Sequence, residues 1–277
     1  SAIRTGNFFN VEIGDTALHC LPADFITGKM MLVRAMILGL SLDLVQPTAD
    51  PMKDVNSSYD FVAMTPMQAH NSLGRLHQIK TLIIGGAPIY PKLNEKLVAL
   101  HNNCFETYGM TETITHIAAS KLSVPKKPFR ALDGIHLEVD GDDCLVVDAP
   151  DITDQLIHTN DLVEIHDERT FTYLGRRDNV INTGGVKISP EVAERKLAHH
   201  IRFPFFLHGI PDEVLGQKLI MVVEAGDDQA KEVEQQLAAC DSLEKFELPK
   251  TLYYVSEILR NNGKYLRGKT VDILPII

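Results

Sequence analysis

The chain has 277 residues, of which 44% are hydrophobic and 23% charged, a composition typical of a globular protein with room for two domains. Its formal net charge of −10 argues against a nucleic-acid-binding surface, because such surfaces gather lysine and arginine to neutralise phosphates. The longest apolar run, residues 30–40, is interrupted by Arg34 and is shorter than the roughly 20 residues that span a bilayer, so we expect no membrane insertion.

The cysteines and the first residues indicate the compartment. The four cysteines are far apart and lack the spacing of a zinc site or a C-x-x-C pair, which favours reduced thiols in the core of a cytoplasmic protein. Residues 1–6 have no apolar signal core. The sequence also starts without a methionine, so we expect it to be a fragment of a longer chain.

The first 100 residues predict strands that alternate with helices. Residues 16–25 are typical of a short strand that runs into a loop, and residues 28–39 of a buried helix that ends at Gly39. Residues 42–45 predict a strand, and residues 80–100 predict a strand, a Gly-Gly turn and a helix that begins at a proline. This order indicates a parallel sheet with both faces covered.

From about Ile135 apolar and polar residues alternate between turn residues, which favours antiparallel strands. Ser189 and Pro190 then predict the start of a helix, with serine as N-cap and proline at the first helical position. We predict two domains, 1–176 and 177–277. The smaller one is expected to contain strands at 203–210, 218–225 and 251–259 and a helix at 228–240.

Gly85-Gly86-Ala87-Pro88 follows an apolar strand. Two glycines at such a point let a flat ligand approach the backbone, although a Gly-Gly pair is also common in a simple tight turn. The pattern G-x-G-x-x-G of dinucleotide folds is not supplied at this position.

Residues 104–118 contain an aromatic ring at Tyr108, a hydroxyl at Thr111 and a carboxylate at Glu112. These groups can stack on a base, contact a phosphate and hold a hard cation. The alternative interpretation is that Thr111 starts a helix ahead of the apolar residues that follow.

Asp161 and Arg176 lie where we predict strand ends. A carboxylate and a guanidinium at such positions can hydrogen-bond the hydroxyls of a ribose. Taken singly, each is also compatible with a solvated surface charge.

Residues Gly263–Thr270 match the phosphate-loop pattern G-x-x-x-x-G-K-[ST]. That pattern binds phosphate only between a buried strand and a helix, and the residues that follow include Pro275, so we predict neither the helix nor a phosphate loop. Lys264, in a basic loop with a glycine before it, is the more interesting lysine. The alternative interpretation is that this loop is an ordinary run of solvated charges.

In this order, these segments resemble the adenylate-forming superfamily, the acyl-CoA synthetases and their relatives, over nearly the whole chain. Segments 20–47 and 105–118 are most similar to its o-succinylbenzoate–CoA ligases of menaquinone biosynthesis. The resemblance implies an α/β fold. A large N-terminal domain would combine mixed and parallel sheets, covered by helices, with a β-barrel-like antiparallel part, and a small mobile α+β domain would follow and carry the catalytic lysine.

The resemblance also implies roles for individual residues. It places Lys264 and Thr111 at the reacting phosphate, Glu112 at Mg²⁺, Asp178 at the hinge between the domains, and Gly184 with Gly185 along the path of coenzyme A. Glu106 stands where many relatives have asparagine. The implied nucleotide-binding residues are Gly85, Gly86, Ala87, Pro88, Glu106, Thr107, Tyr108, Gly109, Asp161 and Arg176. The candidates for contact with the acyl substrate, which lie in or near the matching segments, are Phe25, Arg34 and His116, with Arg130 as a further donor. His116 is equally compatible with an ordinary packed histidine.

The implied activity is that of an ATP-dependent acid–CoA ligase, which adenylates a carboxylate, here o-succinylbenzoate, and passes the acyl group to coenzyme A. Alternatives are another acyl- or aryl-CoA ligase, an enzyme that loads the thiol of a carrier protein, and a nucleotide-binding fragment without catalysis. The superfamily's own Ser/Thr/Gly-rich phosphate loop is not found in this sequence and is expected upstream of Ser1.

Overall fold

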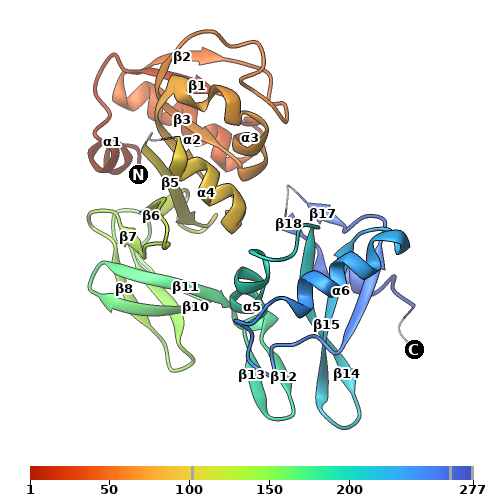
Figure 1. The fold of residues 1–277 in the computed structure, drawn as a ribbon. Coiled ribbons are helices and arrows are strands. Elements are labelled where there is room, and N and C mark those ends of the chain that lie inside the picture. The colour runs from red at the N-terminus through yellow and green to blue at the C-terminus, as the bar shows by residue number, and fades with distance from the viewer. Residues whose placement is uncertain (101–102, 262–263, 276–277) are drawn as a thin grey trace. The chain divides into compact units, whose positions relative to one another are not determined.

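The computed structural model describes residues 1–100, 103–261 and 264–275 (Figure 1). Contacts divide the chain into two compact units. The first unit comprises Ser1–Ile89, Leu93–Thr159 and Val163–Tyr173, and the second comprises Tyr90–Lys92, Asn160–Leu162 and Leu174–Ile277.

The first part of the chain forms a parallel sheet in the order β2-β1-β3-β4-β5. Its strands are β1 (Thr16–His19), β2 (Ser41–Leu44), β3 (Tyr59–Met64), β4 (Ile79–Ile84) and β5 (Asn103–Gly109). The helices between them are α1 (Ala2–Phe9), α2 (Ile26–Leu38), α3 (Pro66–Asn71) and α4 (Pro91–Ala99), with a 3-10 helix, η1 (Leu73–Gln78).

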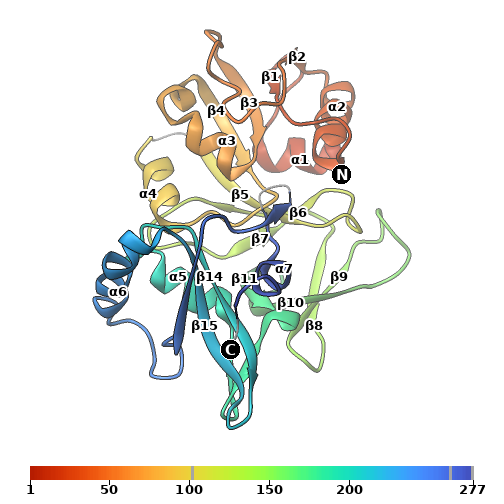
Figure 2. The same ribbon diagram turned by 90° about the vertical axis from the view of Figure 1, so that its right-hand side faces the viewer.

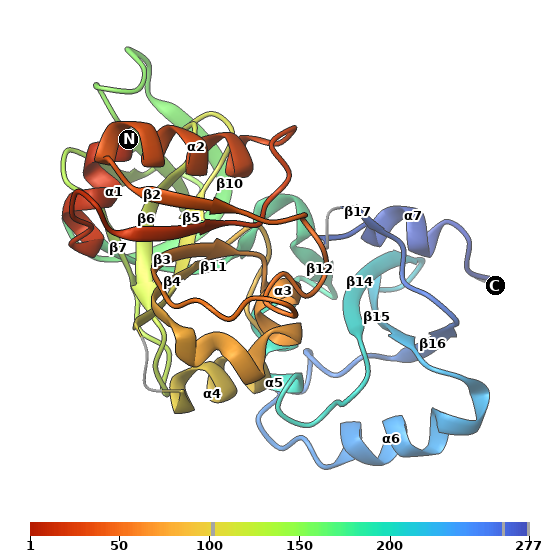
Figure 3. The ribbon, with the colours of Figure 1, turned by 90° about the horizontal axis from the view of Figure 1, so that it is seen from above.

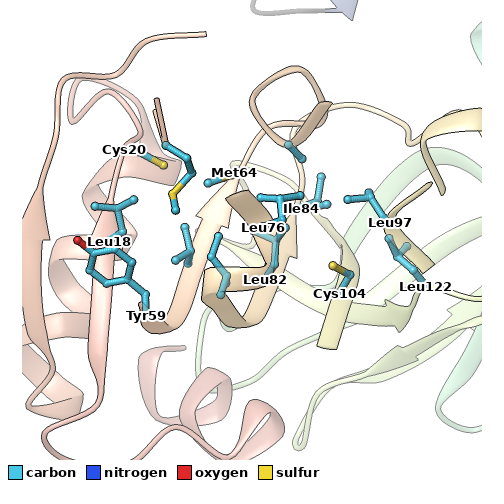
Figure 4. Packing of buried hydrophobic residues seen from close by; sticks show 14 of the residues in the cluster. Leu18, Cys20, Tyr59, Met64, Leu76, Leu82, Ile84, Leu97, Cys104 and Leu122 are labelled. Atoms are coloured by element: carbon cyan, nitrogen blue, oxygen red, sulfur yellow. The ribbon is translucent and has the colours of Figure 1, made fainter. Parts of the chain in front are cut away.

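Helices cover both faces of this parallel sheet (Figure 3). Successive side chains of a strand point to opposite faces, and β3 shows this directly: Phe61 and Ala63 pack on the side of α1 and α2, whereas Val62 and Met64 pack on the side of α3 and α4. Figure 4 shows the second of these clusters, which extends to Leu97 of α4. Burial on both faces explains why the strands of this sheet are almost continuously apolar.

The sheet continues from β5 into antiparallel strands in the order β6-β7-β11-β10-β9-β8. Their bounds are β6 (His116–Lys121), β7 (Phe129–Ala131), β8 (His136–Val139), β9 (Cys144–Asp148), β10 (Ile157–Asp167) and β11 (Thr170–Arg176). One face of these strands packs around Phe129, Phe171 and Leu145. The predicted change from parallel to antiparallel pairing is therefore present, within one eleven-stranded sheet of the described residues.

The second unit is built on β14 (Phe205–Asp212) and β15 (Gly216–Glu224), which pair antiparallel along their length. The remaining elements of this part of the chain are η2 (Arg177–Asn179), β12 (Ile181–Thr183), β13 (Val186–Ile188), α5 (Pro190–Leu197), η3 (Asp227–Gln229), α6 (Ala230–Ala238), β16 (Thr251–Val255), β17 (Arg260–Asn261), β18 (Lys264–Tyr265) and α7 (Arg267–Val271). Leu207 and Met221 pack on the side of α5 and α6, whereas Phe206 and Val222 pack against the C-terminal residues, including Val271 of α7. Figure 2 shows α6 and α7 on opposite sides of these strands.

Three sequence expectations need correction. The helix α2 is only half buried, since Met36 and Ile37 are 74% and 57% exposed. A short helix, α7, does occupy Arg267–Val271, where we predicted none, because Pro275 lies beyond its end and does not interrupt its hydrogen bonds. Ser189 precedes α5 as predicted, but its hydroxyl does not cap the helix and donates to the carbonyl of Leu174 at 3.0 Å.

Candidate functional site

The Gly-Gly turn follows directly after β4. Gly86 has a φ of 87°, a left-handed conformation that favours glycine, and a side chain at Gly85 would place its Cβ 2.5 Å from Oγ1 of Thr107. Ile84 pairs with Glu106 across β4 and β5, so the turn and residues 107–109 leave the sheet at the same end. Both predicted nucleotide-binding segments thus lie side by side in the first unit.

Glu106 is held by two groups that the sequence alone did not identify as its partners. Its side chain is buried, its Oε1 accepts a hydrogen bond from the amide of Ile89 at 3.3 Å, and Lys126 forms an ion pair with it. The ammonium of Lys126 also lies 5.5 Å from the centre of the Phe129 ring. The only signal in the sequence for this pairing was the Lys126-Lys127 pair, which stands 20 residues away along the chain.

Residues 110–115 form a turn between β5 and β6, so the alternative of a helix starting at Thr111 is wrong. The buried hydroxyl of Thr113 explains the turn, because it accepts from the amide of Met110 at 3.0 Å and lies 2.8 Å from the carbonyl oxygen of Thr115. Thr111 and Glu112 are exposed at this turn. Both side chains are therefore available to a ligand.

Tyr108 is part of an aromatic cluster beside this turn. Its ring centre lies 5.9 Å from that of Phe129, 5.2 Å from that of Phe171 and 6.2 Å from that of Tyr173. A ring held from several sides offers a fixed face to a base.

Arg34 and His116, both candidates for the acyl site, are in contact inside the first unit. Arg34 is 2% exposed, its Nη2 donates to Oγ1 of Thr115 at 2.6 Å, and the same nitrogen lies 3.4 Å from Nδ1 of His116. Oγ1 of Thr5 lies 3.2 Å from the other ring nitrogen of His116. Within the described part of the chain no carboxylate forms an ion pair with Arg34.

Burial sets the charges of this pair. It lowers the pKa of Arg34 to about 10, so the guanidinium stays charged at neutral pH. Burial, with Arg34 as a second cause, holds the pKa of His116 well below its usual value, so the imidazole is neutral. Arg34 is thus a buried cation whose hydrogen-bond partners are neutral, and such a cation can accept an anion.

The other two acyl candidates are placed differently. Phe25 precedes the first turn of α2 and is 48% exposed. Arg130 lies on β7, is exposed, and acts electrostatically on Asp167. Neither residue is a contact of the Arg34 guanidinium.

Asp161 and Arg176, predicted as ribose ligands, form an ion pair with 3.5 Å between Oδ1 and Nη1. Asp161 lies inside β10 and not at a strand end as predicted, whereas Arg176 does end β11. The predicted hinge residue Asp178 belongs to the same group, since its Oδ2 accepts from Arg176 and from Asn160, each at 3.1 Å. Asn160 was not identified from the sequence.

Gly184 and Gly185 form the two-residue turn of the β12–β13 hairpin. Their φ angles of 59° and 83° are both in the left-handed region, as a tight hairpin turn requires. The amide of Gly184 also donates to the carbonyl of Leu215 at 2.8 Å. The backbone alone therefore accounts for the two glycines, whether or not a ligand passes them.

Lys264 is exposed on β18 and pairs with Asn261 of β17 across a two-stranded hairpin. Gly263, the first residue of the phosphate-loop pattern, lies outside the described residues. The strand β18 of this short hairpin lies inside the pattern, and the last residues of the pattern belong to the five-residue α7. Neither the buried strand nor the helix start of a phosphate loop is therefore formed in the described residues.

The described residues contain neither a metal cluster nor a membrane-spanning helix. No three His, Cys, Asp or Glu side chains come together as metal ligands among them, and Glu112 remains a predicted ligand by itself. None of the described helices combines the length and the hydrophobicity that a membrane crossing requires.

Comparison with known proteins identifies the family. Residues 1–152 match the model of the family described as AMP-binding enzyme. An acyl-CoA synthetase (AMP-forming)/AMP-acid ligase II-like protein from Dyadobacter fermentans has 36% sequence identity and a TM-score of 0.62, covering 98% of this chain and 81% of that chain.

Two further relatives are named for the same acid, o-succinylbenzoate. A 2-succinylbenzoate–CoA ligase from Bacillus cytotoxicus is 26% identical over 96% of this chain and 63% of its own length. The O-succinylbenzoate coenzyme A synthetase (MenE) from Bacillus subtilis, in complex with ATP and magnesium ion, has a TM-score of 0.82 at 19% identity, over 98% of this chain and 64% of that chain. The chain thus spans slightly less than two thirds of these relatives. It has the adenylate-forming fold expected from the sequence, and it belongs to the AMP-binding enzyme family.

Proposed function

We propose that the complete protein is an ATP-dependent, AMP-forming acid–CoA ligase and that its acid is o-succinylbenzoate. Membership of the AMP-binding enzyme family and the relatives named as CoA ligases support the reaction class. The observation that carries the choice of acid is the buried Arg34 beside neutral His116. Substrates with a second carboxylate need such a donor, and a buried charge is retained where it has an anion to meet.

For the nucleotide, we propose that Asp161 accepts hydrogen bonds from the ribose and that Arg176, fixed by its ion pair with Asp161, donates to it. The Gly85–Pro88 turn and Tyr108 contact the adenine, Gly85 and Gly86 because they lack a side chain and Tyr108 because its ring is held in place. Glu106 remains a candidate for the adenine amino group, although Lys126 and the Ile89 amide already engage its carboxylate.

In the first half-reaction, an oxygen of the substrate carboxylate attacks the α-phosphorus of ATP. A bond from that oxygen to phosphorus forms, the bond to the bridging oxygen breaks, and pyrophosphate leaves with its electron pair. Lys264 neutralises charge on the carboxylate and the α-phosphate oxygens, because its long stem ends in a compact cation. Thr111 contributes a hydroxyl to the same phosphate.

In the second half-reaction, the sulfur of coenzyme A attacks the carbonyl carbon of the acyl-adenylate. The carbon–sulfur bond forms, the bond from that carbon to the AMP oxygen breaks, and the thiol proton is released to solvent. We propose that Asp178 is the hinge between 1–176 and 177–277 and that Gly184 and Gly185 border the path of the thiol.

Mg²⁺ fits as an ion that arrives with ATP. It usually keeps several waters and binds through one or two carboxylates together with substrate phosphates, so the single exposed carboxylate of Glu112 is sufficient. When bound, the ion neutralises phosphate charge. Glu112 itself would hold and orient it.

The test is thioester formation by the complete protein from o-succinylbenzoate, ATP, Mg²⁺ and coenzyme A, with Lys264→Ala and Lys269→Ala compared. Both lysines are exposed and lie five positions apart, but only Lys269 belongs to the Gly-Lys-Thr of the phosphate-loop pattern. We expect Lys264→Ala to slow adenylation about 10²–10³-fold and Lys269→Ala to leave it unchanged.

Each other result selects another function. Activity with different acids but not with this one keeps the ligase and removes the substrate. Transfer to a carrier-protein thiol but not to coenzyme A indicates a carrier-loading enzyme. If the complete protein binds ATP and adenylates no acid, it is a nucleotide-binding protein without this catalysis.

A further inference from the structure

Arg267 stands three residues after Lys264 and points away from solvent, with 16% of its side chain exposed. It donates to both carboxylate oxygens of Glu194, at 2.6 and 2.9 Å, and to the carbonyl of Leu207 at 2.9 Å. Its guanidinium also lies 5.8 Å from the centre of the Phe206 ring. A planar fork bound at three points fixes the direction in which the chain leaves it.

Glu194, the partner on α5, is 4% exposed and makes one more contact. Its Oε1 accepts from the amide of Leu207 at 2.7 Å. Burial raises the pKa of Glu194, and Arg267 acts against that rise. The carboxylate of Glu194 therefore depends on Arg267 for its counter-charge. Through Arg267, the hairpin of β17 and β18, called the lysine hairpin below, is joined to both α5 and β14.

The other end of the lysine hairpin has an arginine as well. Arg260, on β17, donates to Oε2 of Glu224 at 2.7 Å and lies 5.2 Å from the ring centre of Tyr265. The ring of Tyr265 is 6.1 Å from that of Phe206. The two arginines thus hold the hairpin from both flanks, while Lys264 between them stays exposed.

A second acidic residue of α5, Glu191, connects Arg267 to the segment of the predicted hinge residue Asp178. Its Oε1 lies 3.8 Å from Nη2 of Arg267 and accepts from Nδ2 of Asn179, the neighbour of Asp178, at 2.5 Å. Glu191 also packs closely against the backbone of Gly175, where a Cβ would lie only 2.5 Å from its Oε2. The first turn of α5 therefore contacts both Asn179 in the hinge segment and Arg267 after the lysine hairpin.

We propose that Arg267 is a positioning residue for Lys264, and that Glu194 and Glu191 on α5 make the lysine hairpin and the hinge segment one rigid piece. The inference rests on the proposed function, which gives Lys264 its role in adenylation. It adds that Arg267 sets the position of Lys264. Loss of the contacts of the Arg267 guanidinium should therefore slow adenylation, which uses Lys264, and leave thioester formation unchanged.

The experiment uses the complete protein with Arg267→Gln, Arg267→Lys, Glu194→Gln and Lys264→Ala. Arg202→Gln is the control, because Arg202 is a 75% exposed arginine of the same unit whose ion pair with Glu232 is 4.0 Å long. Adenylation is followed as pyrophosphate release, and the second half-reaction as thioester formation from chemically prepared acyl-adenylate.

We expect Arg267→Gln to lower kcat of adenylation about 10²-fold with little change in KM for ATP, since a displacement of about 1 Å at a catalytic group has an effect of that size. Arg267→Lys restores only part of it, because an ammonium cannot make the forked contact. Thioester formation from the acyl-adenylate changes less than about threefold, in keeping with a contact made for one step only. Arg202→Gln changes neither rate.

Hydrogen exchange gives a readout that does not need activity. In Arg267→Gln the amides at 259–261 and 264–266 should exchange at least about tenfold faster, while those of β14 and β15 keep their protection. Equal loss of protection in β14 and β15, or equal slowing of both half-reactions, overturns the inference, because Arg267 is then an ordinary stabilising residue.

The two proposals fail differently. If Lys264→Ala blocks adenylation and Arg267→Gln does not, only the positioning role is wrong. If Lys264→Ala adenylates normally, the role proposed for the lysine is wrong, and the positioning role falls with it. If the wild-type protein adenylates no acid, the proposed function is wrong, and the exchange of the hairpin alone decides whether Arg267 holds it.

Discussion

At the scale of single residues, Arg34 is the strongest indication of a carboxylate on the substrate, because it is a buried cation whose hydrogen-bond partners are neutral. We predict that Arg34→Met raises KM for o-succinylbenzoate about 10²-fold, the effect of removing a buried charged hydrogen-bond donor from its partner. An analogue whose second carboxylate is replaced by a methyl group should show no such change. The measurement is kcat/KM for both acids.

Arg202→Met is the control for this prediction, since Arg202 is a 75% exposed arginine that is not a candidate for contact with the acyl substrate. Equal losses of kcat/KM for both acids in Arg34→Met would place Arg34 away from the second carboxylate. The variant is expected to fold, because Arg34 has no carboxylate partner among the described residues and its removal leaves no buried charge unpaired.

The residues missed from the sequence are mainly partners in long-range pairs. Glu106 stood out by the family resemblance, but Lys126 could be found only once β5 and the loop after β6 were folded together. Thr5 and Thr115 beside Arg34 and His116 were missed for the same reason. Local spacing identifies a chemical group and leaves open which distant group will neutralise it.

At the scale of elements, the β12–β13 hairpin depends on its two glycines. Gly185 has a φ of 83°, and a Cβ at this position would meet no atom within 4 Å, so a side chain there causes only backbone strain. We predict that Gly185→Ala lowers the free energy of unfolding by about 1–2 kcal/mol. Gly268→Ala, inside α7 with free space around it, should raise it by up to about 1 kcal/mol.

Urea unfolding of the two glycine variants measures both effects. Equal stability changes would show that φ does not distinguish the two positions. A slower thioester step in Gly185→Ala with normal adenylation would add support for the proposed path of coenzyme A.

Elements with strong local signals were predicted well, and the others were not. Gly39 ends α2 in a left-handed conformation, and Pro91 begins α4. The turn at 110–115 was ambiguous because threonine can cap a helix or close a turn, and a hydrogen bond from Thr113 to the carbonyl of Thr115 decided between them. The short α7 was missed because packing of Val271 against β14 and β15 stabilises it, and propensity does not.

At the scale of the whole molecule, the buried neutral histidine makes stability depend on pH. The native pKa of His116 lies well below the value of about 6.5 for an unfolded chain, so the unfolded state binds more protons in acid. The contribution is fully present above pH 6.5 and is lost as the pH falls below it, by up to about 1.4 kcal/mol per pH unit.

Calorimetric unfolding of the wild type and His116→Gln between pH 7.5 and 5 measures this term as a difference, in which the other titrating groups cancel. We expect the stability of the wild type to fall more steeply than that of the variant below pH 6.5. Parallel curves would mean that His116 has the same pKa in the native and the unfolded protein.

The contact between Arg267 and Glu194 joins residues 73 positions apart, so it can form only after the last segment of the chain has been synthesised. Without Arg267, burial of Glu194 beside β14 would favour the protonated form of its carboxyl group. Arrival of the last segment brings the guanidinium that favours the ionised form. Docking of the segment that carries Arg267 therefore supplies the counter-charge of an acid whose pKa burial raises.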